Sequence, residues 1–334
     1  MRLFPRSFRG WTWRAAALAA LSLTMVLSAC GAGNATSTST KTSTGALTIG
    51  NAGTLQPGVL KWGEDSTGGM PYIVPKDSLN TGADYYGFEY DIMKAMGQLM
   101  NVQQQPTQVT WSNWPQGLQA QQYDFFMNGL ELTTDNLQSA QFSIPYYVYT
   151  QSIVVLSSNT TINSFNDLAG KSVETGTGYK AQQILEAYNA DPTHTSKINI
   201  VATDFPTPFT DLLSGRVDAE FLDTPIAKWY GQHDPSGKYK IVGGDLNPGY
   251  YAIGFSPSNP NTPVLMKEVN LAIEQLWLNG TLQKIYQTGG ANNAGPNNQS
   301  ALEPYDLWNS VQGCVTNFFP VNPGHVTGCP NPYG

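Results

Sequence analysis

Four acidic residues stand beside short apolar runs, at positions where carboxylates could do chemistry. Glu64 and Asp65 follow one such run, Glu131 follows the run 125–127 and an Asn-Gly pair, and Asp223 closes a third run. Two carboxyl groups can act together as general acid and base. A buried carboxylate can instead hold a cation, because a buried charge without a partner is costly. The residue types therefore offer two chemistries, proton transfer and cation binding.

The residues that other catalytic mechanisms need are missing from the sequence. The chain has three histidines, none of them at metal-ligand spacing, and it contains no Cys-x-x-Cys pair. It also contains neither a Gly-x-Ser-x-Gly elbow nor a phosphate-binding loop. A net charge of −7 argues against nucleic-acid binding, which needs clustered Lys and Arg. We therefore predict a protein that is not an enzyme, needs no cofactor or metal, and binds no nucleic acid.

The first candidate site residues follow the apolar run Phe125-Phe126-Met127, which is typical of a buried strand. Ligands of open α/β sheets lie just outside the carboxyl ends of the strands. Asn128, Gly129 and Glu131 are therefore expected on the lip of a cleft, and an ordinary strand followed by a turn is the alternative.

Two further stretches place polar groups beside the same kind of cleft. Residues 176–180, Gly-Thr-Gly-Tyr-Lys, lead into a helical pattern, and the unpaired N–H groups of a helix start can bind a carboxylate. A plain tight turn is the alternative for this stretch. Asp223 closes the strand 220–222, where its carboxylate would either meet a ligand or cap the helix that follows.

The order of these residues resembles the extracellular solute-binding proteins, family 3, which serve ABC transporters of polar amino acids. The residues that carry the resemblance are Tyr123-Asp124, Asn128-Gly129, Thr133, Phe142-Ser143 and Pro145-Tyr146-Tyr147, and it extends from about residue 60 to 290. It implies an α/β fold of the periplasmic-binding-protein type II class, with two α/β lobes joined by two crossing strands. It also implies a monomer that captures a small molecule between the lobes and delivers it to a membrane permease.

The resemblance also implies roles for individual residues. Asp65 and Tyr72 take the positions of the loop that borders the ligand, although Tyr72 packed in the core is the alternative. Gly178 and its neighbours match the turn that binds the ligand's carboxylate, and Asp223 matches the aspartate that binds its ammonium. Asn136 departs from the pattern, because the family has at that position an arginine that clamps the carboxylate.

This departure shapes the expected ligand. Asn136 cannot provide the paired, charge-assisted hydrogen bonds of an arginine, whereas Glu131, Asp65 and Asp223 make the cleft acidic. Tyr72 and Tyr179 could flank a cation. We therefore predict a basic amino acid or a related amine, with one alternative: Lys180 supplies the missing positive charge and restores ordinary amino-acid binding.

The two ends of the chain predict an exported lipoprotein. Residues 1–29 have a basic start and an apolar stretch, and Leu27-Ser28-Ala29-Cys30 matches a lipoprotein cleavage site. We expect lipid on Cys30, a tether over 30–58, and a position on the outer side of the cell membrane. The only other cysteines, Cys314 and Cys329, are expected to pair in a C-terminal appendage, 291–334.

The predicted lobes comprise residues 59–148 with 252–290, and residues 153–247. Two alternatives to transport share this organisation: a lipoprotein that senses a ligand and signals to a receptor, and an enzyme of the same fold, such as a dehydratase.

Overall fold

The computed structural model describes residues 50–68, 71–76, 85–204, 209–233 and 236–288. The chain divides into two units, 1–45 and 46–334, and every described residue belongs to the second. The signal segment, most of the tether, the C-terminal appendage and all three cysteines lie outside the described residues, so the predictions about them are not tested here.

The first sheet has five strands in the order β4-β1-β5-β12-β6. Their bounds are β1 Val59–Glu64, β4 Gln103–Gln108, β5 Phe125–Phe126, β6 Gln141–Phe142 and β12 Gly254–Phe255. β1 pairs in parallel with β4 and β5, while β12 runs antiparallel to β5 and β6. The strand predicted from the apolar run after Tyr123 is β5, so Asn128 and Gly129 do follow a carboxyl end beside β1.

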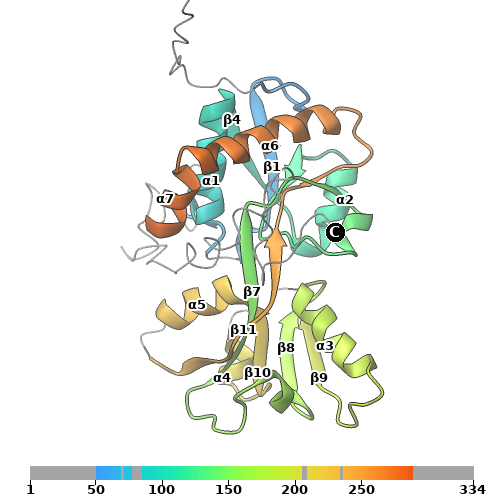
Figure 1. Cartoon of the computed structure of the whole chain (residues 1–334), viewed down its shortest axis with the longest axis vertical. Coiled ribbons are helices and arrows are strands. Elements are labelled where there is room, and N and C mark those ends of the chain that lie inside the picture. Colours follow the sequence, from blue (N-terminus) through green and yellow to red (C-terminus); the bar gives the residue numbers. More distant parts are fainter. Residues whose placement is uncertain (1–49, 69–70, 77–84, 205–208, 234–235, 289–334) are drawn as a thin grey trace, which may run out of the picture. The chain divides into compact units, whose positions relative to one another are not determined.

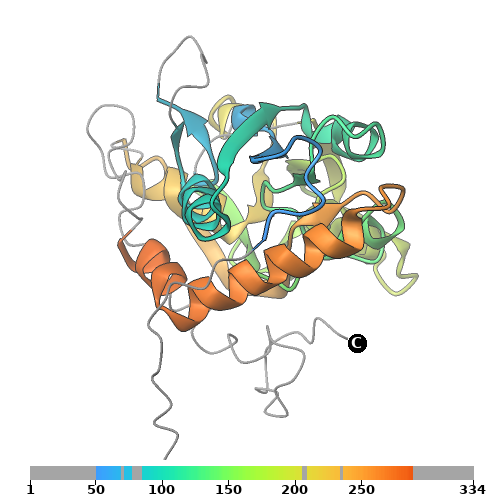
Figure 2. The same ribbon diagram turned by 90° about the horizontal axis from the view of Figure 1, so that it is seen from above.

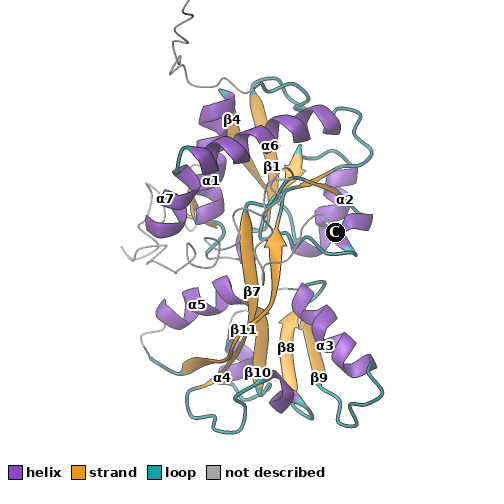
Figure 3. Ribbon diagram, viewed as in Figure 1, coloured by secondary structure: helices purple, strands orange, loops and turns teal. Residues whose placement is uncertain are grey.

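Four helices accompany this sheet, as Figure 1 shows in colour and Figure 3 by element type. They are α1 Phe88–Met100, α2 Trp114–Gln119, α6 Thr262–Leu278 and α7 Thr281–Thr288. Apolar residues recur at helical spacing in α1 and α6, so each helix buries one face. α1, α6 and α7 contact one another, and Figure 2 shows α6 leading into α7 beside α1.

The second sheet has the strand order β11-β7-β10-β8-β9. Its strands are β7 Tyr147–Leu156, β8 Ser172–Gly176, β9 Asn199–Thr203, β10 Ala219–Asp223 and β11 Tyr239–Tyr251, and its helices are α3 Lys180–Ala190, α4 Thr210–Leu213 and α5 Thr224–His233. β10 pairs in parallel with β8, and β8 with β9. The carboxyl ends of β8 and β10 therefore lie at one edge, where Gly176 precedes the α3 entry and Asp223 precedes α5.

Two long strands connect the sheets. β7 and β11 pair antiparallel from Tyr239↔Leu156 to Tyr251↔Tyr147. Just beyond that pairing, Tyr146 N donates to Tyr251 O and Ala252 N donates to Leu130 O, which ties the strands to the first sheet. The predicted fold of two α/β lobes joined by two crossing strands is confirmed; the exact lobe boundaries stay a prediction.

The remaining elements are short. They are the hairpin β2 Val74–Pro75 and β3 Tyr85–Tyr86, and the 3₁₀ turns η1 Ser66–Gly68, η2 Trp111–Asn113, η3 Asn136–Gln138 and η4 Phe165–Leu168. Among the described residues, no helix has both the length and the apolar character needed to cross a bilayer.

Candidate ligand-binding site

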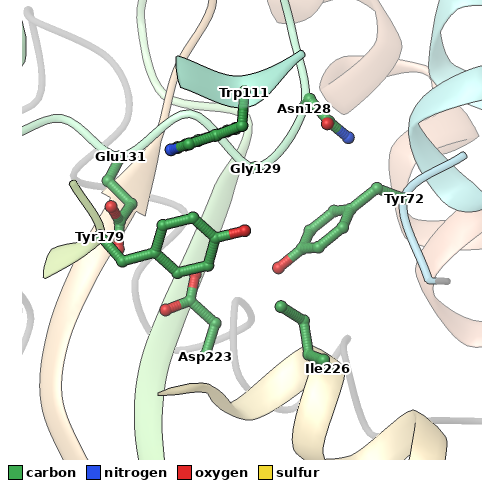
Figure 4. Close-up of a pocket in the computed structure, with 8 residues that line it drawn as sticks. All are labelled: Tyr72, Trp111, Asn128, Gly129, Glu131, Tyr179, Asp223 and Ile226. Carbon is green, nitrogen blue, oxygen red and sulfur yellow. The ribbon is translucent and has the colours of Figure 1, made fainter. Parts of the chain in front are cut away.

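A small pocket lies where residues from both lobes meet. Its lining consists of Tyr72, Trp111, Asn128, Gly129, Glu131, Tyr179, Asp223 and Ile226, which Figure 4 shows around a central space. Six of the ten predicted ligand-binding residues are among them. The enclosed space is only about 10 Å³, room for roughly one water molecule, so the lobes must part to admit a ligand.

Two glycines position Tyr72 at this pocket. At Gly87, which has φ 125°, a Cβ would lie 2.0 Å from the carbonyl oxygen of Tyr72, and the first N–H groups of α1 donate to that carbonyl and its neighbour. At Gly129, which has φ 60°, a Cβ would lie 2.9 Å from the Tyr72 ring. Because only glycine fits both the backbone angle and the space, Tyr72 lies against the strand end. It is buried in the core and also lines the pocket, and its contact with a ligand stays a prediction.

Asp65 supports the pocket from behind rather than lining it. Its Oδ2 accepts a hydrogen bond from the backbone N–H of Trp111 at 2.7 Å, and its own backbone N–H donates to Oδ1 of Asn128 at 3.0 Å. Asp65 therefore positions two lining residues, Trp111 through its carboxylate and Asn128 through its backbone N–H. The neighbouring Glu64 is also buried, and burial raises its pKa to about 8, which keeps the carboxyl neutral at pH 7.

Glu131 and Asp223 bring two carboxyl groups together in the pocket, from different lobes. Both are almost fully buried, at 1% and 3% exposure. Burial raises the pKa of Asp223 to about 7. Burial, and then the charge of Asp223, raises the pKa of Glu131, whereas the backbone N–H of Lys180 lowers it. The unliganded pair therefore retains a proton that ordinary carboxyl groups would have lost.

A line of hydroxyl groups ends on Asp223. The Tyr251 hydroxyl donates to Oδ2 of Asp223, and the Tyr72 and Tyr251 hydroxyls are 2.7 Å apart, so Tyr72 is the donor of that pair. Gln151, from β7, donates to Oδ1 of Asp223 at 2.7 Å. These bonds favour the ionised form of Asp223 and fix its carboxylate at the pocket.

Residues 176–180, predicted to bind a ligand's carboxylate, contact the side chain of Glu131. The backbone N–H of Lys180, at the start of α3, donates to both carboxylate oxygens of Glu131, at 3.1 and 2.9 Å. Gly178, with φ 79°, forms the turn before α3, and its N–H donates to Gln182 Oε1. The stretch is thus a carboxylate-binding helix start, and its partner is a side chain of the same protein.

Three predicted site residues lie beside the pocket without lining it. Lys180 directs Nζ to Oε1 of Gln183 at 3.4 Å, Asn136 donates its amide to the carbonyl oxygen of Glu131 at 2.8 Å, and Gly178 shapes the turn. Neither Lys nor Arg occurs among the described residues that line the pocket.

Two lining residues were not predicted. Trp111 lies edge-on to Tyr179, with ring centroids 5.0 Å apart, although the two come from different lobes. Ile226, on α5, is buried. The helical spacing of Ile226 in the sequence indicates only a core residue. A role for Trp111 at the pocket follows only from its hydrogen bond to Asp65, which joins residues 46 positions apart.

Chemically, the pocket combines two carboxyl groups with three aromatic rings. Aromatic faces and carboxylates both attract cations. Among the residues that the structure describes, no group of three His, Cys, Asp or Glu side chains is placed to hold a metal ion. The arrangement suits an organic cation of small size.

The two-lobed fold with a pocket between its lobes defines a class, the periplasmic type of binding protein. Residues 68–288 match the family model described as bacterial extracellular solute-binding proteins, family 3. This match covers about two thirds of the chain, and the chain belongs to that family, as its sequence pattern predicted.

Relatives and solved structures agree with this assignment. The chain is 25% identical over 216 residues to the ABC transporter arginine-binding protein 1 of Escherichia coli K12, covering 63% of this chain and 84% of that protein. An ancestral arginine-binding protein bound to arginine is 29% identical with a TM-score of 0.61, covering 69% and 96% of the two chains. An ancestral amino acid-binding protein described as a precursor of cyclohexadienyl dehydratase is 26% identical with a TM-score of 0.59, covering 69% and 93%.

Proposed function

We propose that this chain is the substrate-binding component of an ABC importer, which captures a basic amino acid or a related amine and delivers it to a membrane permease. The carrying observation is the composition of the pocket, in which Glu131 and Asp223 meet aromatic side chains and no basic side chain is part of the described lining. Membership of family 3 and the arginine-binding relatives support the same ligand class.

The energetics favour a cation in this pocket. Both carboxyl groups are buried, and keeping such a group ionised without a partner is costly. A ligand ammonium would supply the partner, so the pair could release its proton as the ligand binds. An acidic ligand would add a third carboxylate to the pair and is disfavoured for the same reason.

Ligand capture would close the two lobes around the β7 and β11 crossing strands, a hinge motion of the kind that binding proteins use. Tyr72, Asn128 and Gly129 belong to one lobe, and Tyr179 and Asp223 to the other, so one ligand would contact both. A permease could then distinguish the closed form from the open one. We further propose that lipid on Cys30 keeps the protein, as a monomer, at the outer side of the membrane.

A thermal-shift panel on the purified full-length chain in mild detergent tests the ligand class. Arginine, lysine, glutamine, glutamate and the decarboxylated amines of arginine and lysine are compared at equal concentration. The cationic compounds should raise the melting temperature most. The largest shift with glutamate would overturn the proposal.

An enzyme of the same fold is the second candidate, because Glu131 and Asp223 are adjacent carboxyl groups whose pKa values are both raised. Incubating the chain with its ligand and recovering the ligand separates the two functions. A binding protein returns the ligand with its mass unchanged, and a dehydratase would return a product lighter by one water. A sensor would instead be recognised by a receptor partner in place of a permease.

A further inference from the structure

The carboxylate of Glu131 occupies the start of α3 from the other lobe. Both of its oxygens accept from the Lys180 N–H, and the side chain is buried. In Figure 4 Glu131 lies beside Tyr179, the residue that precedes α3. A helix start binds an anion because its first N–H groups have no partner within the helix. Here an internal carboxylate already satisfies that N–H group.

The other two groups able to hold a ligand's carboxylate make hydrogen bonds within the protein as well. The amide of Asn136, at the position where the family has its arginine, donates to the backbone carbonyl of Glu131 at 2.8 Å. The ammonium of Lys180 bonds Gln183, a side chain of α3. Thus Asn136 steadies the segment that carries Glu131, and Lys180 acts on that same carboxyl group, through its backbone N–H and through its charge, which lowers the pKa of Glu131.

The remaining groups in the pocket favour a positive charge. Asp223 is held by hydrogen bonds from Gln151 and Tyr251, and the rings of Trp111 and Tyr179 lie against each other at the pocket wall. A carboxylate brought in by a ligand would lie near Glu131 and Asp223, and like charges in a buried site repel strongly.

We propose that the ligand is an organic ammonium ion that has no carboxylate, and that Glu131 takes the place of the carboxylate that an amino acid would bring to α3. This inference rests on the proposed function and makes Glu131 a residue that determines specificity. Between a basic amino acid and the amine formed by its decarboxylation, the pocket selects the amine.

The test compares each amino acid with its own decarboxylated amine. Isothermal titration of the full-length chain in mild detergent uses arginine against agmatine and lysine against cadaverine. We expect each amine to bind at least about tenfold more tightly than its parent. In Glu131→Ser the Lys180 N–H becomes available to a ligand, so the preference for the amine should fall by about tenfold or reverse.

A matched control is Glu186→Ser, on an exposed part of the same helix, where the native side chain accepts from Gln182. It should keep the wild-type preference. Glu131→Gln retains the size of the side chain without its charge and should weaken the preference in the same direction as Glu131→Ser. Thermal melting of each variant shows whether it is folded. If Glu131→Ser does not fold, the ratio of amine affinity to amino-acid affinity in the wild type decides the test.

The outcomes separate the two proposals. Parent amino acids that bind wild type as tightly as their amines would overturn this inference and leave the proposed function standing. An unchanged preference in both folded Glu131 variants would also overturn it. If neither amines nor basic amino acids bind, the proposed function itself fails.

Discussion

Replacing Asp223 with asparagine should stabilise the unliganded protein and abolish ligand binding. Burial raises the pKa of Asp223 from 3.8 to about 7. In the folded protein the ionised form is therefore disfavoured, and folding stability falls as pH rises from about 4 through 7. A shift of this size corresponds to a ceiling of about 4 kcal/mol at pH 8, with no contribution below the unfolded pKa.

The asparagine variant removes that cost and keeps one of the two hydrogen bonds that Asp223 accepts from Tyr251 and Gln151. Its side-chain carbonyl can still accept from Tyr251 or from Gln151. Denaturant unfolding of both proteins at pH 3.5 and pH 8 measures the difference in the free energy of unfolding. We expect the stability of the variant relative to wild type to increase as the pH is raised from 3.5 to 8.

A suitable control is Asp167→Asn, at an exposed capping box. Asp167 accepts from the N–H groups of Asn163 and Ser164, which lower its pKa. A group with a lowered pKa stabilises the fold at high pH and loses that effect on acidification, so this variant should lose stability at pH 8. An Asp223→Asn variant that is less stable than wild type at pH 8, or a pH-independent difference, would refute the reasoning.

Three further expectations concern the glycine under the pocket, the pH dependence of binding and the C-terminal cysteines. Gly129→Ala should destabilise the protein by about 1–3 kcal/mol in thermal or denaturant melts, because φ of Gly129 is 60° and a Cβ would press on the Tyr72 ring. The control is Gly231→Ala, on α5 with open space around it, which should not destabilise the protein. As the pH is raised from 5 to 7, the pocket carboxyl groups lose their proton, and affinity for a cationic ligand should increase by up to about tenfold per pH unit. An affinity that does not change from pH 5 to 7 would count against a proton displaced by the ligand. Reduction should add about two hydrogens to the intact mass if Cys314 and Cys329 form a disulfide, and no change would mean that both are free thiols.

Much of the fold follows from short-range patterns. Apolar residues at helical spacing mark α1 and α6, and a run of β-branched and aromatic residues marks β7. Site residues that directly follow a strand were predictable for the same reason. Asn128, Gly129 and Asp223 come after apolar runs, and the carboxyl ends of strands meet at one edge of a sheet.

The rest of the site depends on contacts between distant residues. The bond from the Lys180 N–H to Glu131 joins residues 49 apart in the chain, and neither local sequence shows that they meet. Asp65 was expected to line the pocket, but it holds Trp111 and Asn128 in place from behind. A buried carboxylate near a ligand can contact the ligand or its supports, and composition does not distinguish these roles.

The central claim is that this pocket binds a cationic ligand through Asp223. Titrating agmatine and arginine into wild type, Asp223→Asn and Asp167→Asn at pH 7.5 tests it most directly. We expect that wild type and Asp167→Asn bind at least one of the two compounds, and that Asp223→Asn loses about a hundredfold or more in affinity for it. Equal affinity in wild type and a folded Asp223→Asn variant would contradict the account.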